Sequence, residues 1–221
     1  MKKQHQNWIL RLLIYVAGIT ILALGTILST RTGLGVACIT SAPTAISNVF
    51  GWNLSVVVFA LYALMIVAQF IIKRKEQRAW RDLLQFPVAI LFSVYLEWFG
   101  QLVHVQFDRL WQNLLMMVFA VFLIGLGVCL MVNMDIVPNP PDGLVHTISK
   151  ALRKDMGLIK NITDTTFVAI SAITDLLGRG RIVTVGVGTV YTMIFVGRTI
   201  YVINRFFKTK MRHAVGLDAG I

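Results

Sequence analysis

Six long apolar runs with almost no charge constrain this chain more than any other feature of its sequence. They cover residues 12–30, 54–72, 83–103, 114–132, 162–177 and 182–203. A membrane-spanning helix needs about 20 such residues, because every backbone amide must find its hydrogen bond inside the hydrocarbon. Of the 221 residues, 57% are hydrophobic and 14% are charged, which is too apolar for a soluble globular domain. We therefore expect one all-α integral membrane domain over residues 1–221, with the lipid bilayer as its partner.

Lys and Arg residues cluster in alternate connections between the runs. Sixteen lie on one side, which includes both termini, and four lie on the other. Positive residues are retained in the cytoplasm, so both termini are expected there, with residues 206–221 as a cytoplasmic tail. The net charge of +11 then reflects topology and contacts with anionic headgroups, and no nucleic-acid partner is expected.

The two halves of the chain show a weak internal repeat. A shift of about 102 residues aligns LGTIL at 24–28 with LGVCL at 126–130, and AIS at 45–47 with TIS at 147–149. This suggests repeat one at about 8–103 and repeat two at about 114–205. With three spans each, the halves would be inverted about an axis in the membrane plane. Short matches of this kind also arise by chance in apolar sequences.

Each half carries an interrupted segment after its first span. The first contains Gly33, Gly35 and Pro43, and the second contains the sequence VPNPPDG at 137–143. Pro43 is expected to begin a helix, and Asp142 to cap a helix that resumes near Gly143. If the segments re-enter the membrane, their helix starts would meet near the midplane and present free N–H groups and positive dipole ends.

This geometry predicts a binding site for a small polar or anionic solute between the two segments. The carboxylate of Asp142 would cancel part of the helix dipole, so a neutral polar solute or a cation is the alternative. The candidate residues share polar side chains, helix-breaking backbones or a position at a helix start. They are Thr40, Ser41, Pro43, Asn139, Pro140, Asp142 and Gly143. In the competing interpretation both segments are surface connections, the second lying on the membrane as an amphipathic helix.

Three charged residues within the spans are candidates for a transport pathway or ion coupling. Glu97 and Arg198 occupy matching places in the third and sixth runs, but inversion would put them at different depths. Either can also reach the interface and be hydrated there. Asp164 opens the polar start of the fifth run, which we expect protein to shield from lipid. It either lines the pathway or caps that helix.

Other signals point to packing rather than chemistry. Gly125, Gly127, Gly186 and Gly188 are expected to let helices approach closely. Cys38 and Cys129 have no metal-ligand or redox spacing and are expected to be buried thiols. The sequence contains no nucleophile, nucleotide or metal motif. We therefore expect no enzymatic activity, no catalytic residues, no cofactor and no metal.

The six runs, the segment GLGVACITSAP at 33–43 and VPNPPDG at 137–143 together resemble the YczE/YyaS/YitT family of small bacterial membrane proteins. The resemblance covers most of the chain and implies a multi-pass protein of the bacterial plasma membrane. That family is largely uncharacterised, so it implies little about the substrate. The expected function is transport by a secondary transporter or channel-like mechanism, as a monomer or a homo-oligomer. A membrane scaffold, or a substrate-capturing subunit of an energised transporter, is the alternative.

Overall fold

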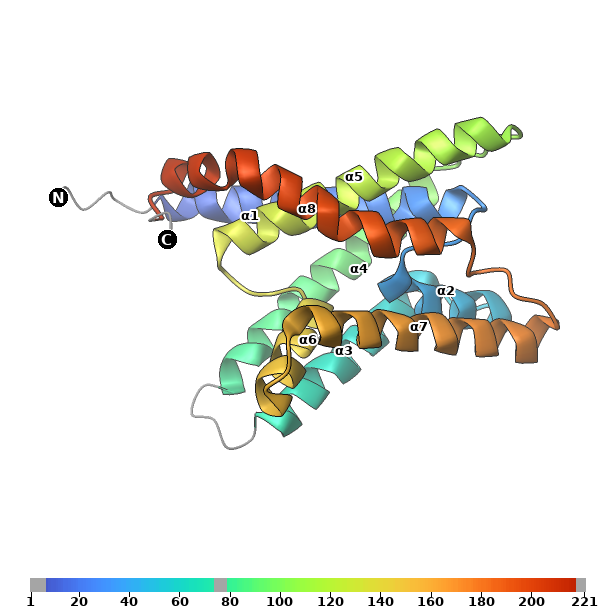
Figure 1. Cartoon of the computed structure of the whole chain (residues 1–221), viewed down its shortest axis with the longest axis horizontal. Coiled ribbons are helices and arrows are strands. Elements are labelled where there is room, and N and C mark those ends of the chain that lie inside the picture. The colour runs from blue at the N-terminus through green and yellow to red at the C-terminus, as the bar shows by residue number, and fades with distance from the viewer. Residues whose placement is uncertain (1–6, 74–78, 218–221) are drawn as a thin grey trace.

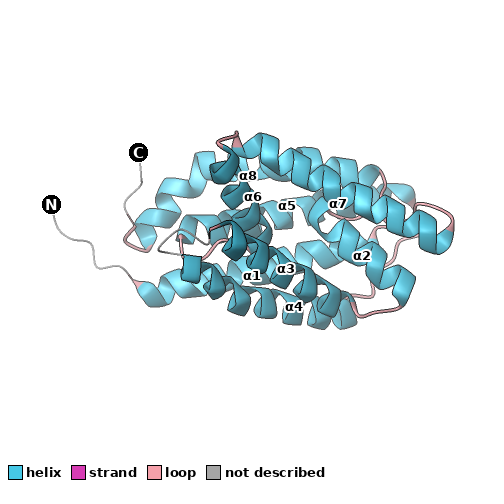
Figure 2. Ribbon diagram, turned by 90° about the horizontal axis from the view of Figure 1, so that it is seen from below, coloured by secondary structure: helices cyan, strands magenta, loops and turns pink. Residues whose placement is uncertain are grey.

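The computed structural model describes residues 7–73 and 79–217, and the part it describes is built of helices joined by short connections (Figures 1 and 2). Their bounds are α1 Trp8–Arg31, α2 Cys38–Phe50, α3 Leu54–Ile72, η1 Ala79–Leu84, α4 Gln85–Leu102, α5 Leu110–Met134, α6 Pro140–Leu152, α7 Met156–Arg179 and α8 Val187–Ala214.

Four segments are long and apolar enough to cross a membrane, namely α1, α3, residues 82–102 and α5. The predicted membrane character is therefore supported, but α7 and α8 do not join this group. The physical reason is a lower mean hydropathy: the central part of α7 carries Asp164, Asp175 and several threonines, and the apolar part of α8 carries Arg198 and several threonines. Residues 206–214, assigned above to a tail, continue α8 as helix.

Equivalent helices in the two halves begin at a constant separation. The pairs of first residues are Trp8 and Leu110, Cys38 and Pro140, Leu54 and Met156, and Gln85 and Val187, each 102 residues apart. Local contacts also correspond: Ser47 donates to the Trp52 carbonyl at 2.6 Å, and Ser149 donates to the Lys154 carbonyl at 2.7 Å. Both short helices end at a residue in the left-handed conformation, Gly51 and Arg153.

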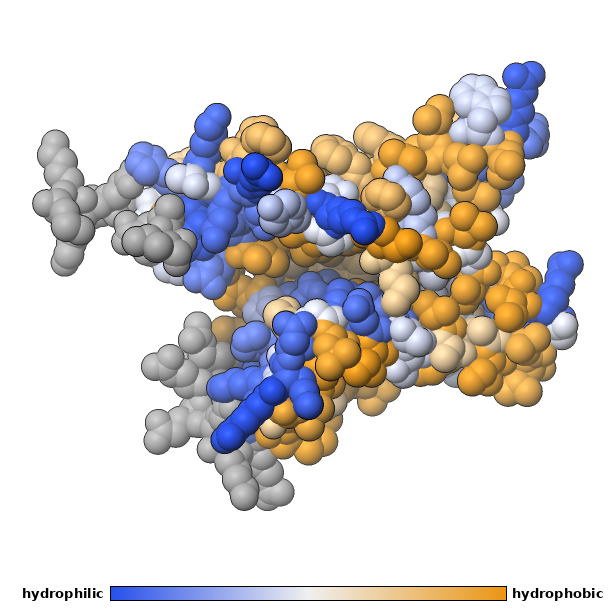
Figure 3. Space-filling model, in the orientation of Figure 1, coloured by the Kyte–Doolittle hydropathy of each residue, from blue (hydrophilic) through white to orange (hydrophobic). Residues whose placement is uncertain are grey.

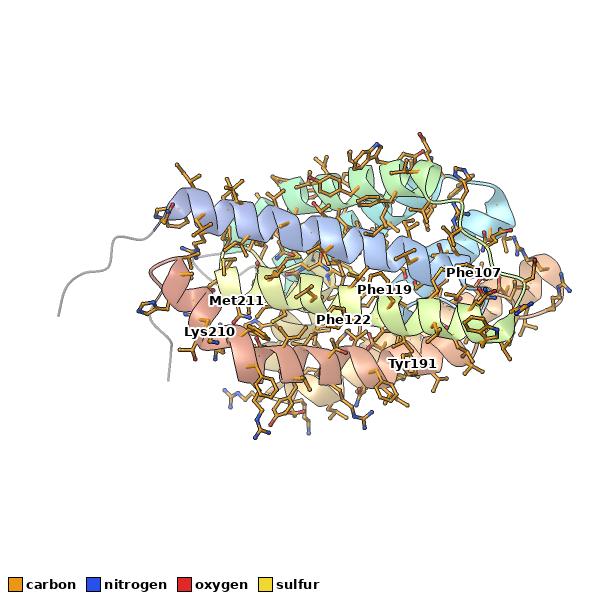
Figure 4. The ribbon with its side chains drawn as sticks, turned by 90° about the horizontal axis from the view of Figure 1, so that it is seen from above. Phe107, Phe119, Phe122, Tyr191, Lys210 and Met211 are labelled. Atoms are coloured by element: carbon orange, nitrogen blue, oxygen red, sulfur yellow. The ribbon has the colours of Figure 1, made fainter. Side chains whose placement is uncertain are left out.

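The helices form two layers, with α1, α5 and α8 side by side in one and α2, α3, α6 and α7 in the other (Figures 1 and 4). Helix α4 packs on both α1 and α3 and so connects the layers. The short helices pack across the halves, α2 on α7 and α6 on α3. Apolar side chains such as Phe119 and Phe122 stand exposed along α5 (Figure 4), where lipid would cover them.

Antiparallel helices α1 and α5 make the most extensive contact in the fold (Figure 1). Glycines permit it, as expected for Gly127: a Cβ there would lie 2.6 Å from the Leu22 nitrogen and 2.7 Å from the Gly18 oxygen. Gly25 faces the α5 backbone in the same way, with the Ala120 oxygen 2.9 Å from a Cβ built on it. Close backbone approach increases van der Waals contact between the helices. This contact drives helix association in a membrane, where the hydrophobic effect does not, because lipid is as apolar as the helix surface.

At the end of the molecule opposite the termini, backbone hydrogen bonds join the connection after α1 to the connection before α8. Val36 donates to the Thr184 carbonyl at 3.1 Å, and Gly188 donates to the Leu34 carbonyl at 2.7 Å. The buried carboxylate of Asp175 fixes this connection by accepting from the Val183 and Thr184 amides at 2.8 and 2.6 Å. Both Gly186 and Gly188 therefore serve the close approach predicted for them.

We expect Gly127→Ala to lower the stability of the folded protein by about 1–3 kcal/mol, because the added methyl group meets the α1 backbone and cannot be relieved by a rotamer change. Gly197→Ala is the matched control, since nothing lies within 4 Å of a Cβ at that helical position. Thermal unfolding in detergent measures both. Equal melting temperatures for the two variants would contradict this account of the interface.

Candidate functional site

A cavity of about 270 Å³ lies between the two layers and is lined by residues of α2, α6 and α7 as well as the long helices. Of the residues predicted from the sequence, Thr40, Asn139, Asp142 and Asp164 line it. Most of the remaining wall is apolar, with Leu22, Ile124 and Val128 among its residues. The space-filling view shows a hollow between the layers, with hydrophilic residues at the end where the termini lie (Figure 3).

The start of α6 is held by three buried side chains from the first half. The Gln69 and Gln85 amides donate to each other at 3.1 and 2.9 Å, and Gln69 also donates to the Pro140 carbonyl at 3.1 Å. Tyr15 donates to the Val137 carbonyl at 2.8 Å. Tyr15 satisfies the Val137 carbonyl, which receives no helical donor because Pro141 stands four residues on, and Gln69 adds a second donor to the Pro140 carbonyl. Together these bonds fix the start of α6.

The preceding turn is anchored by Arg11, which was considered above only as a topology signal. Its guanidinium donates to the Met134 and Asp135 carbonyls at 2.5 Å each, and it lies 4.3 Å from the ring centre of Trp8. These carbonyls are at the end of α5, where helical donors run out. The buried Arg11 therefore closes the end of α5 in front of the site.

Helix α7 brings an ion pair into the cavity. Lys160 donates to Asp164 at 2.9 Å, one helical turn away, and it also interacts electrostatically with Asp142. Lys160 is one of the sixteen basic residues assigned above to the cytoplasmic side, and it was not predicted as a site residue. The signal available was the Lys-x-x-x-Asp spacing, which brings the two side chains together on one helix face.

The structure corrects three predicted helix starts. Helix α7 begins at Met156 with Asp155 as its cap, so Asp164 is not a capping residue. Helix α6 begins at Pro140 with Asn139 at the cap position, which leaves Asp142 within the first turn. Pro43 does not begin α2 but lies inside it, because the helix already starts at Cys38. The carbonyl of Ile39, a cavity residue, consequently has no helical N–H donor.

The other predicted site residues lie outside the central cavity. Ser41 and Pro43 are buried in α2, and Ser41 donates to the Cys38 carbonyl at 2.7 Å. The Pro140 carbonyl is occupied by Gln69. A Cβ at Gly143 would lie 2.6 Å from the Gln69 Oε1, so Gly143 is required for packing against the glutamine pair.

Glu97 and Arg198 are separated from the cavity and from each other. Glu97 accepts hydrogen bonds from Ser55 and Gln101 at 2.7 Å each, in a polar cavity of about 360 Å³. Arg198 is exposed and lies 5.3 Å from the ring centre of Phe195. Both cysteines are free and buried, as predicted. Among residues 7–73 and 79–217, no group of three His, Cys, Asp or Glu side chains could hold a metal ion.

A second cavity, also of about 270 Å³, adjoins the first. Asn139, Asp142 and Val128 line both of them. The second cavity also includes Lys73 and His146, and His146 is exposed. The residues at the start of α6 therefore separate the central cavity from a space that reaches the surface.

We expect Gln69→Met to destabilise the protein by about 1–3 kcal/mol, because the Gln85 amide and the Pro140 carbonyl each lose a buried partner. The double variant Gln69→Met/Gln85→Met should lose less than the sum of the two single variants, since the amides are then removed together. Thermal unfolding of the four proteins gives the coupling. Strict additivity would show that the two amides do not depend on each other.

Comparison with known proteins identifies the family. A model for a family of unknown function (DUF6198) matches residues 9–205, whereas no curated protein and no solved structure matches the chain. The match does not confirm the resemblance to the YczE/YyaS/YitT family. Because it covers nearly all of the described helices, the chain belongs to the family of unknown function DUF6198.

Proposed function

We propose that this protein is a transporter for a small polar solute, which binds in the central cavity between α2 and α6. The observation that carries the proposal is the cavity itself, since it places three charged side chains, Asp142, Lys160 and Asp164, among largely apolar walls. Ionisable residues surrounded by protein within a membrane are costly and are typical of solute and ion pathways. A cavity of this size and composition serves no purpose in a simple anchor.

The proposed architecture has two inverted halves, each with three membrane helices and one short helix. In this arrangement α7 and α8 also cross the membrane, and Asp164, Ser171 and Asp175 of α7 are buried in protein. Support comes from the constant separation of equivalent helices, the antiparallel α1 and α5, and the reciprocal packing of α2 on α7 and α6 on α3. Transporters with inverted repeats bind their substrates between interrupted helices at the repeat interface.

The proposed access route leads to the end of the molecule that carries both termini. Two observations support it: Asn139 and Asp142 line both cavities, and backbone hydrogen bonds join the connections after α1 and before α8 at the opposite end. Alternating access would separate those two connections and close the second cavity. We place the protein in the bacterial plasma membrane, with no catalytic reaction and no cofactor, in agreement with the resemblance to YczE/YyaS/YitT proteins.

Reporter fusions at both termini are expected to show cytoplasmic locations, because the two ends lie on the side with sixteen Lys and Arg residues against four. An alkaline phosphatase fusion after the C-terminus should be inactive and a fluorescent protein fusion should be bright. An active phosphatase at the C-terminus would contradict both the orientation and an even number of spans.

Blocking the junction of the two cavities should abolish transport. Liposomes containing the purified protein are screened with neutral, cationic and anionic small solutes, each with and without a proton gradient. Val128→Trp should reduce flux of the transported solute to the level of protein-free liposomes, because Val128 lines both cavities. Val118→Trp is the matched control on the exposed face of the same helix. Failure of every solute to cross with the wild-type protein would favour a scaffold.

A further inference from the structure

We propose that the solute is a small organic cation whose primary ammonium group is bound by the carboxylate of Asp142 and the side-chain oxygen of Asn139. The inference rests on the proposed transport function and specifies its substrate class. It replaces the anionic solute suggested by helix starts alone, because the side chains in the cavity present acceptors where an anion needs donors.

The charges of the cavity do not cancel. Its charged side chains are Asp142, Asp164 and Lys160, and the hydrogen bond of Lys160 goes to Asp164. Asp142 makes no hydrogen bond or ion pair with another side chain in the part of the chain that the structure describes. Lys160 attracts Asp142 electrostatically but donates its hydrogen bond to Asp164, so two carboxylates share one ammonium group. The cavity keeps one negative charge in excess, and a bound cation supplies the missing charge.

Asn139 provides a second, independent acceptor. It is only 8% exposed, and its amide lies within hydrogen-bonding reach of the Tyr62 hydroxyl, while its Oδ1 has no partner among the described residues. Buried polar atoms are almost always paired, so an unpaired one that lines a cavity indicates a donor from a ligand or water. A primary ammonium group has three N–H donors and can bind Asp142 and Asn139 at once.

The start of α6 is poorly suited to an anion. Helix starts bind anions through the free N–H groups of the first turn. Here Pro140 and Pro141 occupy the first two positions and have no N–H, so Asp142 alone contributes one, and its own carboxylate repels an anion. In the other short helix, Pro43 leaves the Ile39 carbonyl without its helical donor, which adds another acceptor near the cavity.

The rest of the wall fits the hydrocarbon part of such a cation. Tyr62 and Phe92 stack with ring centres 5.5 Å apart and line the cavity. Aromatic faces attract cations, and Leu22, Ile124 and Val128 offer apolar contact to a short alkyl chain. A bare metal ion would gain nothing from these walls, whereas an alkylammonium ion uses both the acceptors and the apolar surface.

The test measures binding of n-butylammonium, tetramethylammonium, butyrate and butanamide to the purified full-length protein by isothermal titration calorimetry. n-Butylammonium should bind the wild type, and tetramethylammonium, which has no N–H donor, should bind more weakly. Asp142→Asn should weaken n-butylammonium binding by about 10- to 100-fold. Asp108→Asn is the matched control, because Asp108 is an exposed carboxylate in the connection before α5 and should leave the affinity unchanged.

A second variant separates recognition from folding. Asn139 makes no side-chain capping bond, so Asn139→Ala should leave α6 intact and weaken n-butylammonium binding by about 3- to 10-fold. Stronger binding of butyrate than of n-butylammonium, or wild-type affinity in a folded Asp142→Asn protein, would overturn the cation proposal. Binding and flux of butanamide alone would overturn it and leave the transport function standing. Absence of binding and flux for all solutes would overturn both.

Discussion

The connections next to the two short helices leave backbone groups that need hydrogen-bond partners inside the protein, and this constraint explains much of the structure. At one end, Val36 and Gly188 complete the connections by backbone hydrogen bonds to Thr184 and Leu34. At the other end side chains provide the hydrogen bonds: Arg11, Tyr15 and Gln69 donate to the carbonyls of Met134, Val137 and Pro140. The two short helices can therefore sit inside the fold, and a cavity forms between them.

In the proposed arrangement of two related halves, the equivalent helices carry different chemistry. All three charged residues of the central cavity, Asp142, Lys160 and Asp164, come from the second half. The first half supplies Thr26, Thr40, Tyr62 and Phe92. The position equivalent to Gln69 is Ser171, whose buried hydroxyl has no partner among the described residues. In the proposed site, this divergence would give a bound solute one preferred orientation.

The sequence predicted the helical class and the first four apolar spans because these depend on local runs of apolar residues. It also identified Thr40, Asn139, Asp142 and Asp164, which the fold brings to one cavity. Lys160 was not predicted as a site residue because the fifth apolar run was expected to begin at residue 162. The corresponding helix, α7, begins at Met156, so Lys160 is helical rather than part of a loop. The Gln69 and Gln85 pair depends on contact between two helices, and no local pattern reveals it.

The polarity of α7 has a consequence for how the protein reaches its membrane. In the proposed arrangement α7 is a spanning segment whose polar residues prevent stable residence in lipid by itself, and α2 provides its largest cover. Helix α2 is synthesised about one hundred residues before α7. The surface of α2 that packs on α7 therefore stays uncovered until α7 has been synthesised. Membrane insertion and tertiary assembly then become one event for this segment, and an interrupted synthesis after α6 would leave α2 exposed to quality-control proteases.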